Sequence, residues 1–394
     1  GITGCLVVYS VGEFLSKKTK GAVSSLLFAC VLFLIGFWSG LLPKDITTQS
    51  GLVAVMANFG TAFMITNIGT LINLEDLIRE WKTVVISLFA IAAIALICFT
   101  VGSLLFGREY ALIAAPPVAG STVAGIIVTS AAEAANRPEL AAFAVLVLSV
   151  QKFFGIPIST FCIRKELRIK RGSGFFKSNT VEEKSSLKLP SMRIFKETPK
   201  NLRSNTIYIC KVALVACIAD FVGKATLIPG SSPANYILNP NIAYLLFGLI
   251  FARIGFLEKD IFAKANSSGI ITFGLLLMLP GSLATLSPSG LLSMIVPVFG
   301  ILLICSIGII VICGIVGKVL GCSPYTSAAV GVTCMLAYPA TQIITTEGVD
   351  SFEWEGDERQ KAMDYILPKM IIGGFVTVTI ASVAFASIIG PIIF

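Results

Sequence analysis

Histidine is absent from the sequence, and charged residues are scarce. Without histidine the chain lacks the commonest zinc ligand and has no means of forming a His-dependent catalytic triad. Charged residues make up 13% of the chain, roughly half the share found in soluble proteins. Paired carboxylates and a nucleophile beside a base are also missing from the pattern, so we expect neither an enzyme nor a resident metal or cofactor.

The ten cysteines form no CxxC pair and no spacing typical of a disulfide framework. Most of them stand within apolar stretches. We therefore expect free, reduced thiols that behave as small apolar side chains.

Apolar residues are what the sequence has in excess, at 55% with a mean hydropathy of +0.89. Several apolar runs exceed the roughly 18–20 residues that cross a bilayer. A secretory signal explains one such run but not a whole series. The sequence therefore predicts an all-α, multi-pass protein of the cell (cytoplasmic or inner) membrane. Its apolar segments are 2–16, 22–42, 51–72, 84–106, 111–133, 138–162, 206–223, 240–257, 268–286, 291–319, 325–346 and 364–393.

A basic segment divides these runs into two sets of six. Of the 30 Lys and Arg residues, 12 lie between Arg164 and Arg203, beside four Glu. Cytoplasmic loops carry this kind of excess, so the net charge of +8 indicates membrane orientation and not a nucleic-acid partner. We predict an N-terminal membrane repeat over 1–163, a cytoplasmic linker over 164–204 and a C-terminal membrane repeat over 205–394.

The two sets of segments also share residues at matching places. Phe59-Gly60 recurs as Phe273-Gly274, and Met64 recurs as Met278, at an offset of 214 residues. Each match is weak alone, and chance similarity among Leu/Ile/Val-rich helices is the alternative. The series of matches favours an internal duplication.

The fifth and eleventh segments are unlike ordinary spanning helices. The first contains Pro116-Pro117 and the glycines Gly120 and Gly125, and the second contains the polar, proline-broken run 333–342. Backbone groups freed by Pro and Gly are tolerated at membrane depth only inside protein or beside a water-filled cavity. We predict that 111–133 and 325–346 are re-entrant hairpins or broken helices. Close helix packing by small residues is the alternative.

With these two hairpins, each half has five crossings, and an odd number inverts the second half relative to the first. Placing the linker inside puts Arg79, Lys82 and Arg253 inside and Glu109 and Glu139 outside, as the positive-inside rule requires. Both termini are then extracytoplasmic. Inverted repeats with paired discontinuous segments are the architecture of secondary transporters, which bind their substrates near the midplane.

The predicted binding residues gather at the two hairpin tips and on the neighbouring helices. Freed N–H groups there suit anions, freed carbonyls suit Na⁺, and an amide in lipid is costly unless it faces protein or water. The predicted substrate-binding residues are Gly120, Ser121, Thr122, Gly125, Tyr338, Thr341, Gln342, Asn67 and Lys152. The predicted ion-binding residues are Ser121, Thr122, Asn58 and Thr341.

Lys152 stands near the middle of the sixth segment, where an ion is expensive and is usually functional. We interpret it as a fixed positive charge near a substrate carboxylate, or in place of Na⁺; the alternative is a structural partner of a helix end. Its repeat counterpart Lys369 is expected to reach the headgroup region. Glu13 and Asp220 occupy matching places near a membrane face, where solvation at the interface is the favoured interpretation.

Five crossings plus one hairpin per half, outward termini and a basic cytoplasmic loop resemble the sodium/glutamate symporters. The related 2-hydroxycarboxylate symporters share this plan, and the stretch 67–77 is similar to both and to the cation/proton antiporters. The resemblance implies an elevator-type Na⁺ symporter, often a homodimer, with Ser121, Thr122, Thr341 and Gln342 at the binding site. Glutamate symporters carry a Gly-Gly-His-Gly-type motif where this chain has 120–125. The resemblance therefore implies the fold and not glutamate.

We expect cation-coupled symport of a small carboxylate or amino acid, that is, an anionic or zwitterionic substrate with Na⁺ or H⁺. A cation/proton antiporter is the alternative, but it needs a titratable carboxylate at the broken helices, and neither tip carries one. A channel is a further alternative, for which a polar filter-like ring is expected.

Overall fold

A computed structural model of the chain describes residues 1–18, 25–72, 74–120, 122–177, 193–196, 198–199, 203–227, 236–284, 286–336 and 340–393. Over these ranges the protein is all-helical and contains no β-strand. All ten cysteines are free thiols, as the sequence predicts.

The first half of the chain forms a series of helices. They are α1 (Ile2–Lys18), α2 (Ser25–Ser39), α3 (Leu52–Val55), α4 (Thr61–Leu71), α5 (Leu74–Arg79), α6 (Trp81–Ile97), α7 (Ser103–Phe106), α8 (Arg108–Val118), α9 (Thr122–Ala134), α10 (Pro138–Val150) and α11 (Lys152–Gly172). Two π-helical turns, η2 (Met56–Gly60) and η3 (Cys98–Gly102), join α3 to α4 and α6 to α7.

The second half of the chain is also helical. Its helices are α12 (Asn205–Ala225), α13 (Pro240–Arg253), α14 (Ile261–Lys264), α15 (Ser268–Leu276), α16 (Pro280–Leu283), α17 (Pro288–Val319), α18 (Pro324–Val332), α19 (Ala340–Asp350), α20 (Glu358–Phe375) and α21 (Ser382–Ile393). The 3₁₀ turn η5 (Thr333–Met335) follows α18, and the π-helical segment η6 (Val376–Ala381) joins α20 to α21. The segment expected over 268–286 is divided into α15 and α16 near Pro280, because proline lacks the N–H that would continue a helix.

Five helices among the described residues are long and apolar enough to cross a membrane, which makes the chain a multi-pass membrane protein. They are 81–106, 138–172, 205–225, 288–319 and 358–393. The helices 25–39, 61–71, 122–134 and 240–253 are apolar but shorter.

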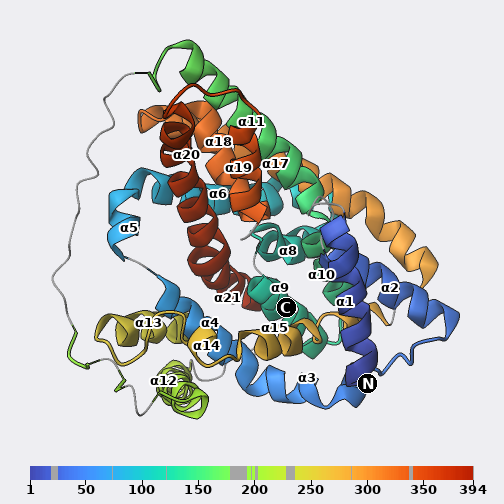
Figure 1. Cartoon of the computed structure of the whole chain (residues 1–394). Coiled ribbons are helices and arrows are strands. Elements are labelled where there is room, and N and C mark those ends of the chain that lie inside the picture. Colours follow the sequence, from blue (N-terminus) through green and yellow to red (C-terminus); the bar gives the residue numbers. More distant parts are fainter. Residues whose placement is uncertain are drawn as a thin grey trace.

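The helices pack as two groups, each drawn from both halves of the chain. The peripheral group consists of α1–α4 and α12–α16, in which α4–α13, α1–α2 and α12–α13 make the most extensive contacts. The central group consists of α6–α11 and α17–α21, in which α17–α18, α6–α17 and α11–α18 do so. In Figure 1 the peripheral group lies along the lower and right-hand edges, and the central group fills the middle and top.

Two helix pairs of the central group each contact both halves of the chain. The pair α8/α9 packs against α10 of its own half and against α21 of the other half. The pair α18/α19 packs against α20 of its own half and against α11 of the other. The helices α6 and α17 also pack directly on each other.

The pair α8/α9 folds back on itself. Arg137, just after α9, donates to both carboxylate oxygens of Glu109, in the first turn of α8, at 2.9 and 2.6 Å. It also donates to Glu139 at 2.6 Å. The hydrogen bonds from Arg137 hold the pKa of Glu109 below its usual value. The two outer ends of the pair therefore lie together, and Gly120 forms its tip.

The two helix pairs approach each other from opposite ends of the α10–α11 helix. Glu139 at the start of α10 belongs to the base of the first pair. Near the other end, the buried Glu166 of α11 accepts hydrogen bonds from Ser323, which precedes α18, and from the Tyr365 hydroxyl at 2.9 Å. The base of the second pair thus lies at the far end of α11.

Candidate functional site

The tips of the two helix pairs meet at backbone contact. Two prolines, Pro116 and Pro117, occupy the last turn of α8, and Gly120 follows with φ of +86°. Glycine is required at this position for two reasons. A side chain is strained at this φ, and a Cβ would lie 1.5 Å from the carbonyl oxygen of Cys334 in η5.

The second helix pair also packs against α20, where adjacent glycines admit its side chains. A Cβ on Gly373 would lie 3.3 Å from Thr333 Oγ1 and 3.4 Å from Ser87 Oγ, and one on Gly374 would lie 3.2 Å from Thr341 Oγ1. A buried hydroxyl layer results, made of Ser87, Thr333, Thr341, Thr345 and Thr377. In four of these residues the hydroxyl donates to a carbonyl one turn earlier in its own helix, so the oxygen lone pairs remain available as acceptors.

A cavity of about 410 Å³ lies between the two helix groups, beside the first tip. From the peripheral group it is lined by Tyr9, Ser25, Leu26, Met64, Ile68, Thr272, Leu275 and Leu276. From the central group it is lined by Gly120, Thr122, Val123, Ile126, Leu148, Gln151, Lys152, Leu336 and Val378. The cavity thus joins both tips to the junction of α10 with α11 and to η6.

Lys152 provides the one positive charge among the described lining residues, and none of them carries a carboxylate. The residue is half-buried at the start of α11. Its ammonium makes no ion pair or hydrogen bond with any residue in the described part of the chain. A cation without a partner in an apolar wall has an unfavourable free energy. The positive charge of Lys152 therefore favours the binding of an anion in the cavity.

Gln151 links the junction of α10 and α11 to the first tip by hydrogen bonds. With its amide nitrogen turned toward α8, Nε2 donates to Pro117 O at 3.0 Å and to Val118 O at 3.2 Å. Because these two carbonyls lie at the end of α8, the contact holds the first tip beside Lys152. Gln151 is almost fully buried.

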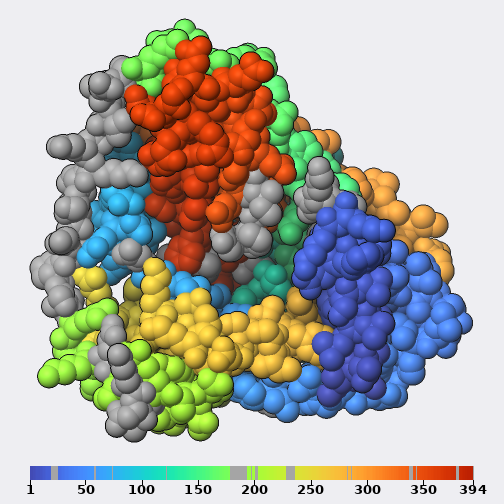
Figure 2. Space-filling view, in the orientation of Figure 1, coloured from blue at the N-terminus to red at the C-terminus, as the bar shows by residue number. Residues whose placement is uncertain are grey.

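On the peripheral side of the cavity, α1 and α15 are in direct contact. The Tyr9 hydroxyl donates to Leu276 O at 2.7 Å, and the Tyr9 ring stands edge-on to Phe273 at 6.1 Å between centroids. Figure 2 shows the two helices side by side on this face of the molecule.

The structure brings three of the predicted site residues, Gly120, Thr122 and Lys152, to this one cavity. Thr341 lies instead in the hydroxyl layer, and the half-buried Gln342 lies next to it on α19. Ser121 and Tyr338 fall outside the described residues, as does the side chain of Asn58.

The other two predicted residues are engaged in packing. A Cβ on Gly125 would lie 2.9 Å from Leu148, so this glycine lets α9 approach α10. Asn67 is buried away from the cavity, and its Oδ1 accepts the backbone N–H of Phe262 at 3.2 Å, at the start of α14.

The other charged residues singled out within the apolar segments are paired or bonded locally and do not line the cavity. Glu13 pairs with Lys17 at 3.0 Å, and Asp220 pairs with Lys224 at 2.8 Å. Lys369 donates to Tyr365 O at 2.7 Å. Lys152 and Lys369, which the sequence pattern pairs as expected counterparts, therefore have different environments.

Several lining residues were not singled out from the sequence, chiefly Tyr9, Thr272 and Val378. Val378 belongs to η6, and π-helical segments recur at functional sites. No local signal marks such a segment, because its extra residue depends on the packing of the finished helix.

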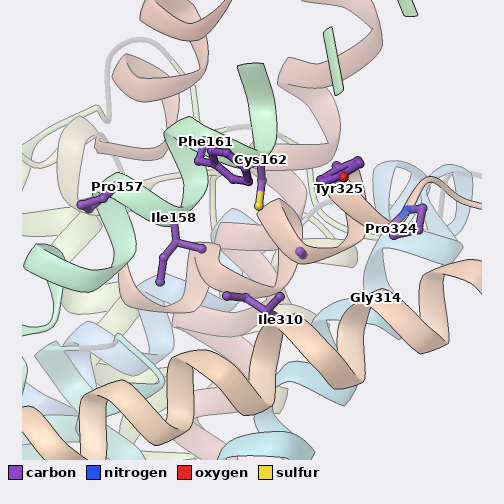
Figure 3. A pocket seen from close by; sticks show the side chains of 9 residues that line it. Pro157, Ile158, Phe161, Cys162, Ile310, Gly314, Pro324 and Tyr325 are labelled. Carbon is purple, nitrogen blue, oxygen red and sulfur yellow. The ribbon is translucent and has the colours of Figure 1, made fainter. Parts of the chain in front are cut away.

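A second cavity, of about 380 Å³, differs in chemistry. Figure 3 shows Ile158 and Cys162 of α11 converging on it with Ile310 of α17. Its other described lining residues are Pro157, Phe161, Gly314, Pro324, Tyr325 and Ala328. It therefore offers no charge to a polar solute, unlike the cavity at Lys152.

No protein-family model matches this chain, and no curated protein matches it.

Proposed function

We propose that the protein is a secondary active transporter that couples Na⁺ to the symport of a small carboxylate or amino acid. The observation that carries the proposal is the cavity between the two helix groups, where the first tip meets Lys152, a cation that pairs with none of the described residues. A site between two groups of helices changes its exposure when one group slides past the other. That motion is elevator-type alternating access.

The arrangement of the two helix pairs supports an inverted repeat with re-entrant hairpins. The pairs approach from opposite ends of α10–α11, and α8 and α18, with 11 and 9 residues, are too short for a bilayer core that needs about 20. With the linker 164–204 in the cytoplasm, the Arg137 cluster lies outside and the Glu166 cluster inside. This orientation of the helices agrees with the distribution of basic residues among the loops.

The hydroxyl layer beside the second tip supports Na⁺ as the coupling ion. Hard cations prefer oxygen ligands, and the hydroxyl groups of Thr333, Thr341 and Thr377 all lie beside the Gly373–Gly374 pair of α20. Antiport of a cation against protons is less well supported, because no carboxylate among the described residues lines the cavity. A homodimer in the cell membrane completes the proposal, with the peripheral group as the scaffold.

Proteoliposomes provide the test. The purified full chain is reconstituted, a Na⁺ gradient or a proton gradient is imposed, and uptake of labelled carboxylates and amino acids is followed. We expect a Na⁺ gradient to drive accumulation that collapses with monensin. Uptake of every tested compound that ignores both gradients would rule out coupled symport.

A further inference from the structure

The cavity at Lys152 contains one cation and no anion, and this imbalance restricts the ligand. A carboxylate can pair with the Lys152 ammonium. An amino acid brings an additional ammonium group, which finds no carboxylate among the described lining residues and is repelled by Lys152. A buried charge without a partner is strongly disfavoured.

Carbonyl oxygens could replace a carboxylate as partners of an ammonium group, but four of the described carbonyl oxygens at or near the cavity already have contacts. Pro117 O and Val118 O face the amide of Gln151. Leu276 O accepts the Tyr9 hydroxyl, and Gly120 packs onto Cys334 O. In contrast, Thr122 and Val123 begin α9, where backbone N–H groups and the helix dipole favour negative charge.

Most of the remaining wall is apolar, with Leu26, Met64, Ile68, Leu148 and Leu275 among its lining residues. Its other polar groups include the neutral hydroxyls of Ser25 and Thr272. A second carboxylate would therefore find no second positive charge among the described lining residues, whereas methyl and methylene groups gain free energy against the apolar wall.

We infer that the cavity selects an aliphatic monocarboxylate of about four to six carbons without an ammonium group, and that it rejects amino acids and dicarboxylates. This inference rests on the proposed function and narrows its substrate class. Burying one methylene group corresponds to about a threefold to fourfold gain in affinity. Affinity should therefore rise from acetate to pentanoate in steps of about that size.

Matched ligands test the inference on the purified full chain in a Na⁺ buffer, by calorimetric titration. The set is 4-methylpentanoate, leucine, which has the same carbon skeleton with an added ammonium, 3-methylbutylamine, and adipate. We expect 4-methylpentanoate to bind at least about tenfold more tightly than the other three. Equal or tighter binding of leucine or adipate overturns the inference.

Variants locate the binding. Lys152→Met should weaken 4-methylpentanoate binding at least about tenfold, and Lys152→Arg should retain most of it because the charge remains. Lys369→Met is the matched control and should bind like the parent protein. Equal binding by the Lys152→Met and Lys369→Met proteins would move the site away from Lys152. The ligand series on the unmodified chain remains decisive if a variant fails to fold.

Failure of the substrate class differs from failure of the proposed function. If leucine binds best and a Na⁺ gradient drives its uptake, transport stands and the class is wrong. If no compound binds and no gradient drives uptake, both are wrong.

Discussion

At the scale of single residues, Gly120 decides whether the two tips can meet. Its φ of +86° and the Cys334 carbonyl against its Cα leave no room for a side chain. Gly107 has the same φ but nothing within 4 Å of its Cβ position. A comparison of alanine substitutions at these two glycines therefore distinguishes the effect of backbone strain from that of steric contact.

We predict that Gly120→Ala abolishes transport and lowers stability by several kcal/mol, because the methyl group forces the tips apart. Gly107→Ala should cost about 1–3 kcal/mol, the strain of an L-residue in a sparsely populated backbone conformation with φ of +86° and ψ of +148°. Thermal unfolding in detergent and uptake in proteoliposomes measure both. Equal losses in the two variants would contradict a tight contact at the tips.

A second residue-scale feature is the buried carboxylate of Glu258, between α13 and α14. It accepts hydrogen bonds from Thr198 and from Lys211 Nζ, the latter at 3.1 Å. Burial alone raises the pKa of Glu258, but these hydrogen bonds and the Lys211 charge outweigh it, and the net pKa is lowered. Thr198 lies in the linker, so the cluster fastens the linker to the peripheral group.

A lowered pKa in the folded state has a definite sign in the stability profile. The stabilisation is complete above the unfolded-state pKa of about 4.3 and is lost as pH falls through the lower folded-state value. We predict that Glu258→Gln costs about 1–3 kcal/mol at pH 7 and that the difference from the parent shrinks below pH 4. Unfolding temperatures measured from pH 7 to 3 test this. A difference that stays constant over this range would exclude the ionised carboxylate as the cause.

At the scale of elements, α4 and α13 cross at backbone contact. A Cβ on Gly248 would lie 2.2 Å from Thr66 O, and one on Gly69 would lie 2.6 Å from Leu245 O. Small residues allow such close crossings in membranes, where dispersion contacts replace the hydrophobic effect as the driving force. This crossing is the most extensive helix contact in the peripheral group.

We predict that Gly248→Ala destabilises the protein by about 1–3 kcal/mol through overpacking and that Gly248→Leu prevents folding. The control is Gly314→Ala on α17, where nothing lies within 4 Å of the Cβ position and where Ala also has the higher helix propensity. Fluorescence-detected size-exclusion chromatography after heating compares them. A Gly248→Leu protein as stable as the parent would contradict the crossing.

Local signals made some elements predictable from the sequence and left others hidden. Pro116-Pro117 and Gly120 mark the break between α8 and α9 because each acts on its own backbone. The sequence also identifies Lys152 as a candidate, because a cation within an apolar run is rare. The meeting of Gly120 with Cys334 joins residues far apart in the chain, and no local pattern encodes it.

Asn67 illustrates why lining residues are hard to predict. In a soluble protein, hydrophobic periodicity tells which face of a helix is buried. In a membrane both lipid and protein interior are apolar, so α4 gives no such direction, and Asn67 turns toward Phe262 instead of the cavity. The sequence identifies Asn67 as a polar residue within an apolar segment, but it does not show which way the side chain points.

At the scale of the whole molecule, the basic linker fixes the expected orientation. We predict that trypsin added to inside-out vesicles cuts between 164 and 204 and yields two membrane-bound halves, because 12 Lys and Arg lie there. Right-side-out vesicles should leave the chain intact at this segment. Cleavage only in right-side-out vesicles would reverse the orientation and place the Glu166 cluster outside.

The central claim is that the cavity between the two helix groups opens alternately to the two sides of the membrane. Thr122→Cys places a thiol on its wall, in a background with the exposed Cys210 and Cys217 changed to Ser. Labelling by a membrane-impermeant maleimide is measured in right-side-out and inside-out vesicles, with and without Na⁺. We predict labelling from both sides and opposite responses to Na⁺, so that a rise on one side accompanies a fall on the other. Labelling from one side alone under all conditions, or parallel changes on both sides, would contradict alternating access.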